Sequence, residues 1–486
     1  MIREAVEGGQ FAPLSPADLR AIHQESLAVL AEVGVEVPLD SARRRFQDAG
    51  APVEGSRVRI PASMVEDALA SVPHSVLLAS RDGQNDILLE GRRVHFGTGG
   101  SPSLVLPPGE DDVRPALLRD VAQLARLAQH LTEADFFVLP VTPTDIPPEK
   151  IAAHRFYAAL RHTTKHIMGG LINLQGARQV LEMGSLLAGG EEALRRRPFI
   201  SCMTSWMVSP LTFDPDVTEI LTFWCEHGMP AALSSAPMAG STSPMTLAGT
   251  LVQLNAEQLA GIIYTQLVRR GTPVLAGYIP GQMNPGTGGY LGGTPEFGLM
   301  QAGAAQLAQF YGVPIYCSAG MSDAKVPDFQ AGAEKTLTLL LAAMAGASYI
   351  HHAVGMIENM NAVSYEQMVL DNDIILMVKR VMRGIAVDAE HLAGEAIRRV
   401  GPGGHYLMDG HTLRHMRSEM VFPRLMDRSA RETWTAAGKR TARQRAAQWV
   451  MDLLAEPAVP CLSLEQDTLL RERFGVHDGL EEGRVG

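Results

Sequence analysis

The sequence of 486 residues lacks the features that mark several large classes of protein. Its 42 Lys and Arg against 53 Asp and Glu give a net charge of -11, so the basic excess that binds nucleic acid or an anionic membrane surface is missing. Its four cysteines, Cys202, Cys225, Cys317 and Cys461, show no CxxC spacing, which argues against a disulfide framework and a structural zinc site. We therefore expect no nucleic-acid partner, no bound metal and a reduced, cytoplasmic environment.

Long hydrophobic runs and targeting signals are also absent. The N-terminus, MIREAVEGGQ, has no apolar signal-peptide core, and the longest apolar run, near residues 337–347, is too short to span a bilayer. No GxGxxG turn opens the first strand–helix unit, and no Walker loop occurs. With 46% hydrophobic and 20% charged residues, the chain is predicted to bury a large core without crossing a membrane.

A regular alternation of short apolar runs and amphipathic stretches is present instead. The eight apolar runs begin at Val94, Asp135, Lys165, Pro198, Pro230, Thr272, Val313 and Ser348. Each gap is long enough for a helix, which is typical of βαβ units. Eight such units predict an α/β protein with a (β/α)8 TIM barrel over residues 93–384, an open doubly wound sheet being the alternative. Residues 1–92 are predicted as an N-terminal helical and hairpin extension, and residues 385–486 as a C-terminal helical extension packed on the barrel.

Polar loops follow the last two predicted strands, at the edge where such barrels place their chemistry. Their charged and imidazole side chains are Asp323, Lys325, Asp328, His351, His352 and Glu358. Because successive residues of a strand face opposite sides, at most one of His351 and His352 is expected to point into the barrel mouth. A single inward His is often a core residue with no role in binding. For Lys325, the alternative to a functional role is an ordinary ion pair with one of the aspartates. A zinc site of Cys317, His352 and a carboxylate is conceivable but has no specific spacing.

Two further sets of residues lie near predicted strand ends. The aromatic set is Trp206, Phe213, Tyr278, Tyr290 and Phe297. Together these rings could cage a quaternary ammonium through cation–π attraction, although each one singly fits core or lid packing. The glycine set of the sixth loop is Gly286, Gly288, Gly289, Gly292 and Gly293. It either lets the backbone approach a bulky ligand or supplies turns with positive φ.

Several long stretches together resemble the trimethylamine methyltransferase superfamily. They are GSTSPMTLAGTLVQLNAEQLAGI, TGGYLGGTPEFGLMQAGAAQLAQFYGVP, SDAKVPDFQAGAEKTLTLLLAAMAGASYIHHAVGMIENMN and GHYLMDGHTLRHMRSEMVFPRLMDR. The combination is specific, although no single piece is. The resemblance implies a (β/α)8 barrel of a methanogenesis-related family, which moves a methyl group from a methylated amine to the cobalt of a corrinoid (cobalamin) on a separate partner protein.

One departure from the family concerns the substrate. The family's archetypal trimethylamine enzymes carry pyrrolysine, whereas this chain contains only standard residues. It therefore resembles the non-pyrrolysine branch, whose characterised members demethylate quaternary amines such as glycine betaine. A quaternary ammonium already has a neutral amine as its leaving group, so catalysis needs mainly in-line positioning and desolvation.

The resemblance implies roles for these residues. Glu358, His351, His352 and Asp323 are expected to position the substrate and balance its charge, with the aromatic set around the cation. Lys325 or a His would hold any substrate carboxylate, with Asp328 nearby, and the glycine set would face the corrinoid. No corrinoid is expected to bind this chain tightly, since its DGHT (residues 409–412) lacks the DxHxxG spacing. A homo-oligomer is expected. A trimethylamine enzyme, a tetrahydrofolate-linked methyltransferase and a non-catalytic betaine-binding paralogue remain alternatives.

Overall fold

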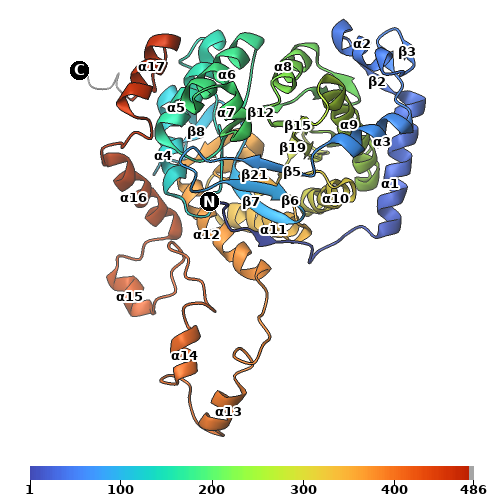
Figure 1. The fold of residues 1–486 in the computed structure, drawn as a ribbon. Coiled ribbons are helices and arrows are strands. Elements are labelled where there is room, and N and C mark those ends of the chain that lie inside the picture. Colours follow the sequence, from blue (N-terminus) through green and yellow to red (C-terminus); the bar gives the residue numbers. More distant parts are fainter. Residues whose placement is uncertain (481–486) are drawn as a thin grey trace.

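The computed structural model describes residues 1–480 as a mixed α/β protein, so the last six residues of the predicted C-terminal extension lie outside the described part. All eight strands predicted from the sequence are present at the centre of the molecule (Figure 1). These central strands are β7 (Arg93–Thr98), β10 (Phe137–Val138), β11 (Ile167–Gly170), β12 (Ile200–Thr204), β15 (Ala231–Ser235), β17 (Val274–Tyr278), β20 (Tyr316–Ser318) and β21 (Tyr349–Val354).

The central strands pair in parallel in two sheets. One sheet has the order β10-β11-β12-β15-β17, and the other contains β20, β21 and β7 as neighbours. Two isolated parallel bridges, Gly97 with Phe136 and Ala276 with Ile315, link β7 to β10 and β17 to β20. The two parallel sheets therefore approach each other at both of these places through single residue pairs.

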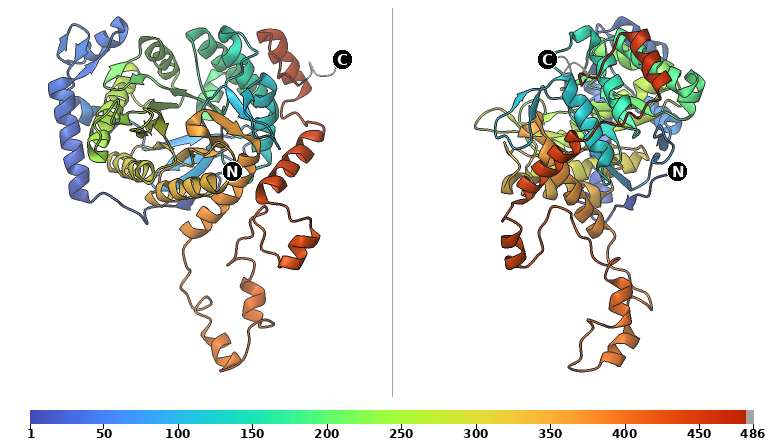
Figure 2. Two further views of the ribbon diagram at one scale, coloured as in Figure 1. Left: turned by 180° about the vertical axis from the view of Figure 1, so that it is seen from behind. Right: turned by 90° about the vertical axis from the view of Figure 1, so that its left-hand side faces the viewer.

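A helix follows every central strand and covers its outer side (Figure 2). These helices are α4 (Leu118–His130), α5 (Ile151–His162), α6 (Leu174–Ala188), α8 (Pro215–Glu226), α9 (Leu247–Val268), α10 (Pro295–Tyr311), α11 (Phe329–Ala345) and α12 (Tyr365–Met382), with the short α7 (Glu191–Arg196) after α6. Local signals set their ends. Thr246 and Thr294 cap α9 and α10, whereas the left-handed Gly312 and Gly346 end α10 and α11.

The N-terminal segment forms the predicted helices and hairpin. It contains α1 (Pro16–Ala28), α2 (Asp40–Asp48), α3 (Ala62–Ser71), β5 (Ser75–Leu78) and β6 (Ile87–Glu90). Ser15 caps α1 in a capping box, as its position before Pro16 predicts. Val76, Leu78, Ile87 and Leu89 of the hairpin pack against a buried cluster of central-strand side chains. The hairpin thus closes the end of the strands opposite the polar loops.

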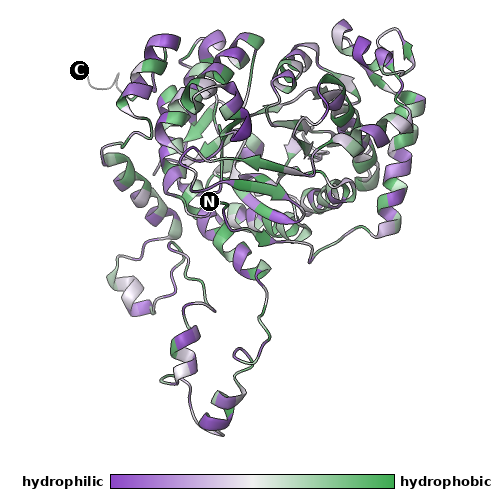
Figure 3. Cartoon of the chain, viewed as in Figure 1, coloured by the Kyte–Doolittle hydropathy of each residue, from purple (hydrophilic) through white to green (hydrophobic). Residues whose placement is uncertain are grey.

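The C-terminal segment has two different parts. Helix α16 (Ala442–Ala455) packs on α12 and α4, and α17 (Leu464–Phe474) packs on α5 and α6. Between α12 and α16, residues 383–441 form an arm that reaches away from the central strands and carries α13 (Gly394–Val400), α14 (Gly410–His415) and α15 (Arg431–Ala436) (Figures 1 and 2). Figure 3 shows a largely hydrophilic α13 and α14, in contrast to the apolar central strands. Among residues 1–480, every helix is too short or too polar to cross a lipid bilayer.

Candidate functional site

The carboxyl ends of β20 and β21 bring His351 and His352 together. Both side chains are buried, and their ring centroids lie 3.9 Å apart. The expectation that at most one of them faces inward was wrong, because β21 has a register shift between Ile350 and Val354 and His352 adopts a φ of +66°. Such an irregularity breaks the alternation of faces and turns the second imidazole toward the first. A Cβ on residue 99 would lie 2.4 Å from the backbone nitrogen of His352, so only a glycine at position 99 leaves room for the backbone of β21 here.

Both imidazoles are held as neutral rings. His351 Nδ1 lies 2.7 Å from the carbonyl oxygen of Cys317, and His352 Nδ1 lies 2.7 Å from the Ser318 hydroxyl. Burial lowers the pKa of His351 to about 3 and takes the pKa of His352 well below its usual range. At neutral pH the pair therefore offers ring faces and hydrogen-bonding nitrogens without positive charge.

Aromatic rings continue this pair into the interior. Tyr316 stacks on His351 with centroids 3.8 Å apart and lies 5.6 Å from Tyr349, which in turn stacks on Phe136 at 3.6 Å. The Tyr316 hydroxyl donates to the Met203 sulfur over 2.9 Å. None of these three rings was predicted as part of the site, although all lie on or beside central strands, where alternate residues face inward. A row of contacting aromatic rings therefore leads from the histidine pair at the carboxyl ends of the strands into the interior.

A buried ion pair between helices α11 and α12 contacts the loops that follow β20 and β21. Lys335 Nζ lies 3.2 Å from Asp371 Oδ2, and both side chains are fully buried. Lys335 also donates to the carbonyls of Gly320 and Met356, which follow β20 and β21. Asp371 accepts from the Gly355 amide over 2.7 Å. Sequence reasoning missed this pair, whose only signal was a lysine inside the apolar helix α11.

Asp323 connects the sixth and seventh loops. Its Oδ1 accepts from the amides of Gly292 at 3.0 Å and Gly293 at 3.2 Å, while its own amide donates to Glu334. Burial raises the pKa of the Asp323 carboxyl. Gly292 and Gly293 are buried against the side chains of Met321 and Glu334, so they cradle a carboxylate instead of offering open backbone.

The other glycines of the sixth loop form an exposed tip. Gly286, Gly288 and Gly289 are exposed, and a Cβ on Gly288 would meet nothing within 4 Å. Gly288 has a φ of +72°, as a turn requires. The predicted corrinoid-facing set is therefore split into an exposed tip and two buried members, and its contact with a corrinoid stays a prediction.

The remaining charged candidates have separate environments. Glu358 is partly buried, with a φ of +51°, and its carboxylate makes no hydrogen bond or ion pair within residues 1–480. Lys325 is exposed and donates to the backbone oxygen of Asp323, and within residues 1–480 it makes no ion pair with an aspartate. Asp328 is exposed and caps α11 by accepting from the Ala331 amide at 3.0 Å. Their roles toward substrate stay predictions.

Most of the predicted aromatic set lies in the core. Trp206, Phe213, Tyr278 and Phe297 are fully buried. Trp206 packs on Phe213 with centroids 4.6 Å apart, and the Tyr278 hydroxyl donates to Asn255. Tyr290 is partly buried and its hydroxyl has no partner in the described residues. These positions assign the first four rings to packing, whereas Tyr290 lies in the loop next to Asp323; contact of any of them with substrate stays a prediction.

Arg155 is a buried cation that sequence reasoning missed. This residue of α5 is only 2% exposed, and its guanidinium donates to the Ser101 hydroxyl at 2.9 Å and the Leu139 carbonyl at 3.0 Å. Both acceptors follow the ends of central strands, β7 and β10. Nε has no partner, and no carboxylate pairs with Arg155 in residues 1–480. Burial lowers its pKa to about 10, so the side chain is still charged at neutral pH.

The zinc site considered around Cys317 does not form in the described residues. The thiol of Cys317 lies 3.2 Å from the Gln301 side-chain oxygen, and burial raises its pKa. His352 bonds to Ser318 instead. Within residues 1–480, the only group of three His, Cys or acidic residues close enough to share an ion lies elsewhere, in the arm.

The fold and this edge define an α/β protein with a site of neutral rings and buried charges at the carboxyl ends of parallel strands. The chain belongs to the trimethylamine methyltransferase (MTTB) family, whose model matches residues 3–474. The family predicted from the sequence is thereby confirmed.

Several relatives match nearly the whole chain. Trimethylamine methyltransferase MttB of Desulfitobacterium hafniense (strain DSM 10664 / DCB-2) is 38% identical over 92% of this chain and 90% of its own length. Glycine betaine methyltransferase of Desulfitobacterium hafniense (strain Y51) is 32% identical over 98% of this chain and 99% of its own length. Trimethylamine methyltransferase MttB of Methanosarcina barkeri (strain Fusaro) is 36% identical over 93% and 92%. The family thus includes methyltransferases named for a tertiary and for a quaternary amine.

Proposed function

We propose that this protein is a cytoplasmic methyltransferase that moves a methyl group from a quaternary amine of the glycine betaine type to the cobalt(I) of a corrinoid on a separate protein. The observation that carries the proposal is the pair of uncharged imidazoles at the carboxyl ends of the central strands, in which His351 stacks on Tyr316 and His352 lies against His351. The faces of neutral rings attract a quaternary ammonium ion. Protonated histidines would repel it, because they carry the same charge.

The scaffold in this proposal is a (β/α)8 barrel. Its support is the continuous parallel pairing of the eight central strands, including the bridges between Gly97 and Phe136 and between Ala276 and Ile315. A helix after each strand and a filled interior of Phe136, Tyr316 and Tyr349 agree with it. In such a barrel the loops that carry Asp323 and Glu358 share one rim with the carboxyl end of β21, which carries His352.

The corrinoid supplies the nucleophile, a cobalt(I) whose electron pair takes the methyl group. The C–N bond breaks with its electron pair left on nitrogen, so a quaternary ammonium departs as a neutral tertiary amine and needs no proton. The residues of this chain then have to orient the amine, exclude water and balance its charge. In our proposal His351, His352 and Tyr316 contact the methyl groups, while the unpartnered carboxylate of Glu358 balances the cation from the rim.

The residues present fit a corrinoid that approaches from outside. Gly286, Gly288 and Gly289 are exposed and present bare backbone on both sides of the small Thr287. The tip lies in the same loop as Gly292 and Gly293, which hold Asp323. We propose that the partner docks over this tip and that the present chain does not itself retain the corrinoid.

The test is incubation of the protein with chemically reduced cobalamin and a panel of glycine betaine, carnitine, tetramethylammonium and trimethylamine. The demethylated amine is measured by mass spectrometry and the loss of cobalt(I) by absorbance. We expect turnover of a quaternary amine and none of trimethylamine. Turnover of trimethylamine alone would contradict the substrate class and favour the tertiary-amine function in the name of the 38% identical relative.

Two further outcomes would contradict the corrinoid as methyl acceptor. Methyl transfer to tetrahydrofolate without any corrinoid would identify a tetrahydrofolate-linked methyltransferase. Binding of glycine betaine in calorimetry, with no turnover in the presence of cobalt(I), would identify a non-catalytic betaine-binding protein.

Arg155 offers a sharper test of the betaine assignment. Its buried guanidinium is the cation we assign to the carboxylate of the substrate, in place of the exposed Lys325. Arg155→Gln should raise KM for glycine betaine about 10-fold to 100-fold, in line with about 1.5–3 kcal/mol for a charge-assisted hydrogen bond, and leave tetramethylammonium unaffected. Lys325→Gln is the control. Equal losses with both substrates would assign Arg155 to folding alone.

A further inference from the structure

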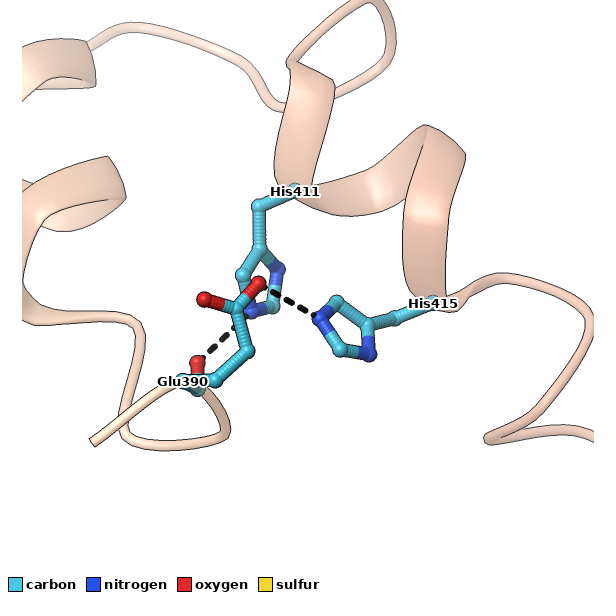
Figure 4. A group of neighbouring side chains, drawn as sticks. All are labelled: Glu390, His411 and His415. Atoms are coloured by element: carbon cyan, nitrogen blue, oxygen red, sulfur yellow. Dashed lines mark hydrogen bonds and ion pairs between the residues drawn. The ribbon is translucent and has the colours of Figure 1, made fainter. Parts of the chain in front are cut away.

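The arm holds a cluster that the proposed methyl transfer does not use. Glu390, in the segment before α13, lies beside His411 and His415 of α14 (Figure 4). The two histidines are four residues apart on a helix, so their imidazoles project from the same face. Figure 4 shows both rings directed toward Glu390.

The distances in the cluster are short. His415 Nε2 lies 2.9 Å from Glu390 Oε1, and His411 Nε2 lies 3.2 Å from the Glu390 backbone oxygen. The ring centroids of the two histidines are 4.4 Å apart. One ligand atom from each of the three residues lies within 4.8 Å of the others. Three ligand atoms from two segments of the arm therefore already converge.

We propose that Glu390, His411 and His415 bind a zinc(II)-type divalent ion, which ties α14 to the segment before α13. Two imidazoles and one carboxylate are a donor set that zinc prefers. Tetrahedral bonds of about 2.0–2.2 Å place ligand atoms about 3.5 Å apart, so the three groups need to approach by about 1 Å on binding. This site departs from the expectation of no metal, which rested on the cysteines.

The surroundings fit an ion with an open coordination position. A cavity of about 580 Å³ lies next to the cluster and is lined by Glu390 and His411 together with Arg398, Arg399 and Arg414. Arg414 Nη2 lies 2.9 Å from Glu390 Oε1, which leaves Oε2 for a metal. Water or a small anion can occupy the fourth position, where the arginines favour negative charge.

Two side chains already contact the Glu390 carboxylate. His415 Nε2 and Arg414 Nη2 each lie 2.9 Å from its Oε1. His391 is engaged by Asp388 through a 2.8 Å contact and lies 3.8 Å from Glu419. It is a neighbour of the site and not one of its three ligands.

The test uses the tag-free full-length protein after treatment with a chelator. Zinc is added alone, the bound ion is counted by elemental analysis, and affinity is measured by calorimetry. Cobalt(II) in place of zinc reports tetrahedral coordination through its visible spectrum. We expect one ion per chain, and a loss of affinity of about 100-fold in His411→Gln, His415→Gln or Glu390→Gln. His405→Gln is the matched control, an exposed His in the same arm that lies outside the cluster.

A second measurement separates loss of the site from loss of the fold. Trypsin cleavage of the arm, which contains Arg398, Arg399 and Arg414, should slow when zinc binds the wild type. It should not respond to zinc in a triple variant that combines the three ligand substitutions. Circular dichroism checks that each variant is folded. Zinc binding by the triple variant equal to that of the wild type overturns the proposal. So does the absence of zinc binding by the wild type, which would reduce the cluster to the hydrogen bond between His415 and Glu390.

Discussion

Histidines in the central strands and in the arm have opposite environments. His351 is buried, bonds to a backbone carbonyl and is neutral because burial lowers its pKa to about 3. His391 in the arm lies at the surface, where its hydrogen bond with Asp388 raises its pKa. The same residue type is thus an uncharged ring in one region and a readily charged group in the other. Solvent access and the nearest polar partner determine the charge state of each imidazole, and the neighbours in the sequence do not.

Ion pairs show the same contrast and give the largest expected effect. Lys335→Met leaves the Asp371 carboxylate buried without its partner and should destabilise the protein by about 3–5 kcal/mol. Arg399→Met removes an exposed partner of Asp409 in the arm and should shift the unfolding midpoint much less. Urea unfolding followed by fluorescence measures both. Equal shifts of the two midpoints would show that burial does not distinguish these pairs.

The pH dependence of stability separates the two kinds of histidine. The folded pKa of His351 lies below its unfolded value of about 6.5, so the unfolded chain binds the proton first and stability falls as pH drops below about 6.5. Between pH 7 and pH 4.5, titration of His351 should lower the free energy of unfolding of the wild type by about 2–3 kcal/mol. His351→Asn, whose amide can still donate to Cys317, should lose less stability over the same range.

The control for this experiment is His391→Asn. The raised folded pKa of His391 contributes stability at low pH that is lost as pH rises through that pKa, so its removal should not flatten the acid slope. Urea midpoints at the two pH values are compared for the three proteins. A slope that is unchanged in His351→Asn, or flattened in His391→Asn, would reverse the assignment of charge to the two regions.

The smallest expected effect concerns a residue predicted to bind substrate. Asp328 caps α11, so Asp328→Ala should destabilise by about 1 kcal/mol, whereas Asp328→Asn keeps a capping oxygen and should be nearly neutral. Demethylation activity should be unchanged in Asp328→Asn. A large loss of activity in that variant, with stability retained, would restore the substrate role expected from the sequence.

Local patterns predicted the framework well. The eight strands and the helices between them follow from apolar runs, capping Thr and Ser residues and glycines such as Gly312 and Gly346. The inward placement of Tyr316 and Tyr349 is also consistent with strand alternation. These features depend on neighbours within one turn or one strand, which a single sequence displays.

The candidate site was less predictable. Trp206 and Phe213 were expected at a rim but pack in the core, because helix α9 and its Gly261 close over the Trp206 ring. The pairing of Lys335 with Asp371 and the position of Arg155 depend on contacts between helices and loops far apart in the chain. Burial and partnership of charged groups are tertiary properties, and a single sequence contains no direct signal for them.

The sequence by itself determined the alternating strands and helices, the family of the chain and the loops in which polar residues gather. Only the tertiary structure decided that His351 and His352 lie side by side, since the shift in β21 overrides strand alternation. It also decided that Glu390, His411 and His415 converge in the arm, where folding joins two segments about 20 residues apart. Periodicity is read along the chain, whereas charge state and ligand geometry arise from contacts across it.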